Sequence, residues 1–185
     1  MRIFILLFIL TTSTLFAETN DFKRNSIQIN PSALLLGNFL SINYQFLITG
    51  RVGLVVDMGI NFKNIKDQYI SLAYRNYLLN DNSSLFYEIF TRYKNLDTES
   101  YFVKTANISE TNMISFTHMD LGLSLGYRWI IADTFPITIK LGYGYPILGE
   151  INYYTTPSVE AKNIIDTVLK ITEGISTELS IGIIF

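Results

Sequence analysis

The chain has 185 residues, with 14 lysines and arginines against 16 aspartates and glutamates, so its net charge at pH 7 is −2. This balance excludes a strongly basic nucleic-acid-binding surface, because counterion release from phosphates needs clustered cations. The absence of cysteine excludes disulfides, thiolate zinc sites and cysteine nucleophiles, and the single histidine, His118, excludes a multi-histidine metal site within one chain. We therefore expect no nucleic-acid partner, no metal and no cofactor.

Residues 1–17 are typical of a cleaved signal peptide. Arg2 precedes an apolar run from Ile3 to Leu10, and Ala17 provides a small residue at a cleavage position. We expect a leader over 1–17 and one domain over 18–185. Export without cysteine is typical of a bacterial envelope protein.

The composition after the leader is apolar, but it contains no membrane helix. Hydrophobic residues make up 49% of the chain and charged residues 16%, against roughly 25% charged in an average soluble domain. No run approaches the roughly 18 consecutive apolar residues that a membrane helix needs. Two folds remain, a soluble β-sandwich or a closed barrel in a membrane, because lipid offers no partner to an unpaired backbone group.

Apolar and polar residues alternate with a period of two in eight segments, which predicts eight β-strands. In chain order the segments are the one around Ile27 and Ile29, then 40–48, 52–62, 70–75, 85–94, 118–129, 137–145 and 175–185. Pro31 interrupts the first segment, which predicts a bulge or a strand end. Phe86 and Phe90 break the pattern by falling on the polar side of their segment.

Short and long connections alternate between these segments. The short ones are 49–51, 80–84 and 131–136, and the longer ones are 63–68, 95–115 and 146–174. This alternation is typical of an up-and-down outer-membrane barrel, which has short periplasmic turns and longer external loops.

The two faces of the predicted strands differ in charge. No charged residue falls on the apolar face of the five clearest strands, where only Thr177 is polar without being aromatic. The opposite face carries four acids and four bases, which are Asp57, Glu88, Asp120, Glu178, Arg75, Arg92, Arg128 and Lys140. This mixture predicts a narrow lumen in which the charges pair and leave no water path. The alternative is the solvated outer face of a sandwich.

Glycines also gather on the polar face, as expected where eight strands leave little interior room. On that interpretation Gly122→Ser is expected to be far milder than Leu123→Arg on the apolar face.

The chain resembles the small eight-stranded outer-membrane barrels of OmpA and OmpX type from Gram-negative bacteria. The likeness lies in the final alternating strand Leu179–Phe185, in the aromatics of 127–129 beside a short turn, and in the segment Ile29–Asn38, which is similar to the first strand of some such barrels. The resemblance implies a monomeric transmembrane barrel in the outer membrane, surrounded by lipid and a lipopolysaccharide-like glycolipid. It also implies that the barrel-assembly machinery reads Phe185, with no periplasmic domain after it.

The resemblance specifies fold and place rather than activity, since unrelated functions share this scaffold. We expect a non-enzymatic structural or surface-binding role through the loops 95–115 and 146–174, and not a general pore. A soluble secreted barrel that binds a small ligand is one alternative.

A lipid A-modifying enzyme of the deacylase type is the other alternative. Ser115, His118 and Asp120 lie close together at the outer end of a strand, and His118 and Asp120 share its inward face. Ser115 has the opposite parity, and the deacylase pattern of a histidine followed by serine, asparagine and glycine is absent. We therefore assign no catalytic residue.

Within the last long connection, Ala161, Ile164, Ile165, Val168 and Leu169 fall at helical spacing. The segment 157–172 is thus compatible with an amphipathic helix over the barrel mouth or on the outer leaflet. An ordered external loop, or an extension of the last strands as a hairpin, are the alternatives.

Overall fold

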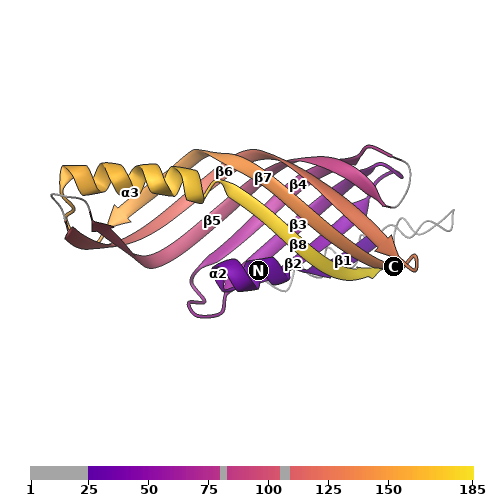
Figure 1. Ribbon diagram of the computed structural model, residues 1–185, viewed down its shortest axis with the longest axis horizontal. Coiled ribbons are helices and arrows are strands. Elements are labelled where there is room, and N and C mark those ends of the chain that lie inside the picture. Colours follow the sequence, from indigo (N-terminus) through magenta and orange to yellow (C-terminus); the bar gives the residue numbers. More distant parts are fainter. Residues whose placement is uncertain (1–24, 80–82, 105–108) are drawn as a thin grey trace, which may run out of the picture.

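The computed structural model describes residues 25–79, 83–104 and 109–185, in which eight antiparallel strands form a closed barrel with β1 paired to β8. The strands are β1 (Asn25–Ile29), β2 (Phe39–Leu47), β3 (Val52–Asn61), β4 (Gln68–Tyr77), β5 (Ser84–Lys104), β6 (Ser109–Ile131), β7 (Phe135–Tyr153) and β8 (Ile175–Ile184). Helices α2 (Pro31–Gly37) and α3 (Val159–Thr172) lie toward the end opposite the C-terminus (Figure 1). The predicted all-β fold with eight antiparallel strands is confirmed, while the predicted leader lies outside the described residues.

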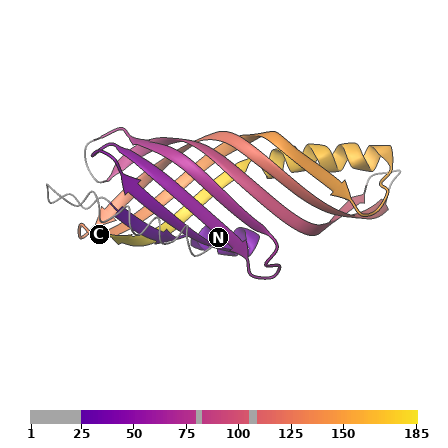
Figure 2. The ribbon, with the colours of Figure 1, turned by 180° about the vertical axis from the view of Figure 1, so that it is seen from behind.

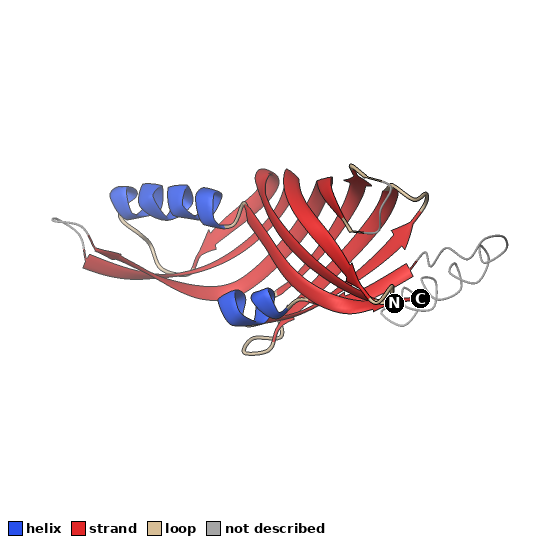
Figure 3. Ribbon diagram, turned by 45° about the vertical axis from the view of Figure 1, so that its right-hand side comes forward, coloured by secondary structure: helices blue, strands red, loops and turns tan. Residues whose placement is uncertain are grey.

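Strands β5, β6 and β7 continue beyond the other strands at the end where α3 lies (Figure 3). Strands β5 and β6 remain paired as far as Lys104 and Ser109. The prediction of a loop over 95–115 is therefore wrong for the described residues of that segment, which form a hairpin. We call residues 95–104 of β5, 109–117 of β6 and 146–153 of β7 the extension.

The extension escaped the periodicity analysis for a physical reason. Inside the barrel most inward side chains are polar, whereas in the extension the inward side chains Leu96, Ile114 and Phe116 are apolar and buried. A bulge between Leu96 and Glu99 also shifts the register of β5 against β6. The polarity of the inner face thus reverses at the rim, so no single alternating pattern runs along the whole strand.

Helix α3 explains this reversal, because it covers the inner face of the extension (Figures 1 and 2). Its buried residues Ala161, Ile165 and Leu169 pack against the apolar side chains of β5 and β6. The Ser158 hydroxyl accepts a hydrogen bond from the Ala161 amide and caps the helix. The expected amphipathic helix is confirmed. The alternative of a hairpin formed by the last two strands is wrong, because β7 extends beside β6 while β8 begins only at Ile175.

Helix α2 corrects the resemblance of 29–38 to a first strand. Strand β1 ends at Ile29, the Asn30 side chain caps the helix by accepting from the Ala33 amide, and Pro31 occupies the first turn. Proline is favourable there because the first amides of a helix have no internal partner. Ser32 accepts a hydrogen bond from the Leu179 amide at 3.0 Å, so α2 takes over from β1 as a neighbour of β8. Neither of the helices described here is long and apolar enough to cross a membrane.

The barrel has a polar interior and an apolar exterior. Arg75 and Glu88 are 0% exposed, whereas Leu123 and Leu125 on the outer face are 65% and 69% exposed. The alternation along each strand fixes this arrangement, because successive side chains point to opposite faces of a sheet. It is the reverse of what a water-soluble barrel with an apolar core requires.

Some interior side chains are apolar, among them Leu47, Val55, Ala73, Phe86 and Phe90. The two phenylalanines fill space left by glycines. In the β5–β6 register Phe86 faces Gly126 and Phe90 faces Gly122. A Cβ atom on Gly122 would overlap the Phe90 ring and approach the Tyr143 carbonyl oxygen to 2.6 Å. The assumption behind the mild effect expected of Gly122→Ser, that a small side chain has room there, is therefore wrong, because backbone as well as a side chain occupies that space.

Candidate functional site

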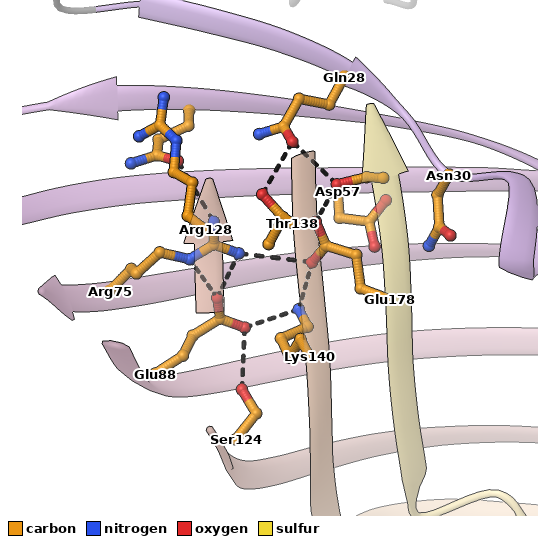
Figure 4. Close-up of polar contacts among 12 residues, drawn as sticks. Gln28, Asn30, Asp57, Arg75, Glu88, Ser124, Arg128, Thr138, Lys140 and Glu178 are labelled. Atoms are coloured by element: carbon orange, nitrogen blue, oxygen red, sulfur yellow. Dashed lines mark hydrogen bonds and ion pairs between the residues drawn. The ribbon is translucent and has the colours of Figure 1, made fainter. Parts of the chain in front are cut away.

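Four charged side chains from four strands meet at the centre of the barrel (Figure 4). Arg75 on β4 and Lys140 on β7 each contact both Glu88 on β5 and Glu178 on β8. The Arg75 contacts measure 2.8 and 3.4 Å, and the Lys140 contacts 2.8 and 3.0 Å. The two cations balance the two carboxylates, which is the condition under which buried charges are tolerated.

Hydrogen bonds that involve uncharged side chains surround this ion network. Gln45 accepts from Arg75 at 3.3 Å and exchanges hydrogen bonds with the Tyr77 hydroxyl, which in turn accepts from Arg128 at 3.0 Å. On the other side Thr138 donates to Gln28 at 3.0 Å. Because β4 and β8 are not neighbours in the sheet, the Arg75–Glu178 contact crosses the interior.

The predicted pairing of four interior cations with four interior acids is correct for three of the cations. Arg75 and Lys140 pair as described, and Arg92 holds Asp120 at 2.6 Å. Arg128 instead donates to a tyrosine hydroxyl, and its guanidinium lies 5.6 Å from that ring. Asp57 accepts from Ser41 at 2.7 Å and from Tyr69 at 3.3 Å. The register between strands determines which side chains pair, and the alternation of polar and apolar residues does not predict that register.

A second polar cluster lies where α3 joins β8. Arg92 donates to the carbonyl oxygens of Glu173 at 2.6 Å and Ile175 at 3.3 Å, in addition to its bond with Asp120. Lys94 contacts the Glu173 carboxylate at 2.9 Å and its carbonyl oxygen at 3.1 Å. Cations at the carboxyl end of a helix satisfy its free carbonyl groups and complement its dipole. This cluster fixes the end of α3 to the barrel, and sequence analysis missed it because Glu173 lies outside the strands.

Residues of the enzyme alternative are only partly brought together. His118 Nε2 lies 3.0 Å from Asp120 Oδ1, and both residues are buried in the interior. The His118 ring stacks on Phe116 with its centroid at 5.1 Å. Ser115 lies on the opposite face of β6, since burial alternates along 114–120 with Ser115 out of phase. A serine, histidine and acid in reach of one another are the geometric requirement for that chemistry, and these three positions do not meet it.

Two cavities reach the polar interior near this rim. One, of about 450 Å³, lies in the mouth and is lined by Asp57, Tyr69, Arg92 and Lys140 among others. The other, of about 260 Å³, lies between β7 and the end of α3, with His118 and Asp120 in its lining. In the described parts of the chain, no group of three or more histidine, aspartate or glutamate side chains is arranged to hold a metal ion.

Tyr153 in the extension and Asp67 in the β3–β4 loop are among the groups with shifted pKa values. Burial, reinforced by a hydrogen bond to Asp166 at 2.6 Å, raises the pKa of Tyr153. Burial also raises the pKa of Asp67, partly offset by the Asp97 amide that donates to it at 2.7 Å. Tyr153 thus keeps its proton at neutral pH and continues to tie α3 to β7.

Comparison with known proteins adds a family to this geometry. Residues 3–176 match a family model described as protein of unknown function (DUF3575). The chain belongs to this family. The match spans β1 to β7, both helices and the beginning of β8. No curated protein and no solved structure matches the chain.

Proposed function

We propose that this member of the DUF3575 family is an outer-membrane β-barrel protein, exported by a cleaved leader over residues 1–17, with a structural or surface-binding role. The observation that carries the proposal is the inverted polarity of the wall. Leucine, isoleucine and aromatic side chains cover the outside, while arginines, a lysine and carboxylates are buried inside. Lipid is the surrounding in which such an exterior is stable.

Strand length and aromatic placement support the same proposal. Strands β2, β3, β4 and β8 contain 9, 10, 10 and 10 residues, close to the roughly 9–11 that a tilted strand needs to cross a bilayer. Exposed aromatic side chains include Trp129 and Phe135 beside the 132–134 turn, and Tyr93, Tyr143 and Tyr145 toward the opposite rim; Tyr74 and Tyr87 are also exposed on the wall. Aromatic girdles of this kind mark the two interfaces of a membrane barrel.

The extension and α3 would then face the outside of the cell, and the short turns would face the periplasm. Loops and external elements on a rigid scaffold are where binding usually resides. We propose a monomer surrounded by lipid and a lipopolysaccharide-like glycolipid. The lipid A-modifying alternative has less support, because Ser115 and His118 lie on opposite faces of β6.

Cell fractionation combined with gel migration tests the location. We expect the protein in the outer-membrane fraction, and we expect unboiled samples to migrate differently from boiled ones in SDS, because a closed barrel in detergent resists unfolding. Recovery in the periplasm without a migration shift would favour the soluble ligand-binding barrel.

The purified protein is expected not to conduct ions in planar bilayers. Eight strands leave an interior just wide enough for side chains, unlike the 16 or so strands of porins. The bonds from Arg75 to Glu178 and from Lys140 to Glu88 bridge that interior. A sixteen-stranded porin recorded in the same bilayers is the positive control. A steady, large, weakly selective conductance would show that chains assemble into a wider pore.

Phe185→Ala is expected to lower the amount of protein in the outer membrane, because the resemblance assigns this side chain to recognition by the barrel-assembly machinery. Substitution is preferable to deletion, since the Phe185 backbone exchanges hydrogen bonds with Asn25 at 2.9 and 3.1 Å. Ile183→Ala is the matched control, as Ile183 and Phe185 are 54% and 51% exposed on the same face of β8. Equal outer-membrane levels of the two variants would argue against this recognition.

A further inference from the structure

The barrel wall opens between β7 and β8. Backbone pairing of these strands runs from Ile137 with Ile181 to Tyr143 with Ile175, followed by one more bond from the Gly144 amide to Gly174 at 2.7 Å. Beyond that point β7 continues to Tyr153, and its neighbour is α3 instead of a strand (Figure 1). A helix cannot form the backbone hydrogen bonds that pair β7 with a strand. Contacts between α3 and β7 are therefore made by side chains.

Two tyrosines make those side-chain contacts. Tyr143 donates to the Lys170 carbonyl oxygen at 2.8 Å, and Tyr153 donates to Asp166 at 2.6 Å. The cavity of about 260 Å³ lies along β7 between these two contacts. We call it the wall opening.

Local sequence in β7 produces the wall opening. The register against β6 shifts between Met119 and Asp120, which leaves Ile147 as a bulged residue beside Pro146. Proline has no amide to donate, so the outer edge of β7 cannot pair with another strand at this residue. Gly149 keeps β7 tight against β6, since a Cβ there would lie 2.7 Å from the Thr117 carbonyl oxygen. The gap is therefore confined to the α3 side.

The lining changes from apolar at the outside to mixed at the inside. Ile147 and Leu148 are 49% and 67% exposed and border the opening on the outer face. Phe116 and Leu169 are buried deeper in it, and His118 and Asp120 lie on the interior side. Leu121 and Tyr145, which are also exposed, connect the border to the apolar outer face of the barrel.

We infer that the wall opening is a binding site for one alkyl chain of an amphiphile that lies at the outer surface of the membrane, with the chain entering the opening beside the Tyr145 rim. The inference rests on the proposed membrane location. An apolar cavity of about 150 Å³ holds one benzene, so 260 Å³ accommodates a segment of a single chain and excludes a whole two-chain lipid. The apolar border places the chain inside, and Lys170, Glu150 and Glu173 in the lining provide charges of both signs for a polar head group.

Photolabelling of the folded protein in phospholipid nanodiscs tests the inference. The probes are palmitic acid with a diazirine near its methyl end and phosphatidylcholine carrying the same chain, with adducts located by mass spectrometry. We expect adducts on Phe116 and Leu169, which are only 3% and 4% exposed and are reached only by a chain inside the opening. Labelling by the free acid alone identifies a free fatty acid as the source, and labelling by both probes identifies the leaflet lipid as well.

Ile147→Trp should fill the border and reduce labelling of Phe116 and Leu169 about tenfold, equivalent to about 1.4 kcal/mol in binding. Leu123→Trp, on the outer face away from the opening, is the control and should leave that labelling unchanged. Both variants are first checked for the migration shift of a folded barrel. Adducts confined to outer-face residues such as Leu123 and Leu125 in the unsubstituted protein would overturn the inference and leave the membrane location supported. Absence of adducts on the outer face as well would contradict the membrane location itself.

Discussion

Replacing Arg75 by alanine is expected to destabilise the folded barrel by about 3–5 kcal/mol, the usual cost of removing one partner from a buried ion pair. Arg75 is fully buried and contacts Glu88 and Glu178. Its removal leaves Lys140 alone between two buried carboxylates. The free energy of unfolding in detergent, followed by the fluorescence of the single tryptophan, Trp129, measures the loss.

The double variant Arg75→Met, Glu88→Gln is the informative comparison. It leaves Lys140 and Glu178 paired at 3.0 Å with no excess charge, so it should be less destabilised than Arg75→Ala. Lys63→Ala, at an exposed lysine of the β3–β4 loop, should have little effect. If the double variant lost as much stability as the single one, charge balance would not be what stabilises the interior.

Leu123→Arg is expected to destabilise the barrel in a bilayer by about 2–4 kcal/mol, the cost of a cation on the lipid face near the membrane midplane. Leu123 is 65% exposed in the middle of β6. Urea titration of the protein in phospholipid vesicles, again followed by Trp129, measures the change.

Val159→Arg is the matched control for the lipid face. Val159 is 80% exposed but begins α3, outside the proposed membrane band, so a cation there should remain hydrated. A glycine of the polar face would be an unsuitable control, because a side chain at Gly122 collides with Phe90 and the β7 backbone. Equal stability of Leu123→Arg and Val159→Arg would indicate that the outer wall faces water.

The two proposals make different demands on the extension. A surface-binding role needs α3 and the β5–β6 hairpin as a rigid external platform, and the bonds from Arg92 and Lys94 to Glu173 supply that rigidity. Binding of an alkyl chain needs a gap beside the same helix, which Pro146 and the bulge at Ile147 create. A rigid platform and a gap are compatible. Hydrogen bonds fix α3 at Asp166 and Glu173, while the gap lies between β7 and the last turns of α3.

The sequence limits the possible partners of the charged side chains inside the barrel, but it does not determine which residues pair. Alternation placed Arg75, Glu88, Lys140 and Glu178 on one face, and charge balance predicted that they pair. Which cation meets which acid depends on the stagger between strands far apart in the chain. For this reason Arg128 forms a hydrogen bond with Tyr77, and Asp57 forms one with Ser41. A neutral partner of this kind cannot be predicted from the pattern of charged residues.

The sequence by itself determined the eight strands, their antiparallel up-and-down order and the apolar and polar faces of the wall. These are local properties, since a period of two and a short turn are written within a few residues. Only the tertiary structure decided the length of β5 to β7, the role of α3 as cover for their inner face, the limits on Gly122 and the opening beside Pro146. Each of these depends on which segment lies opposite another once the barrel closes, and packing across that distance has no local periodicity to predict it.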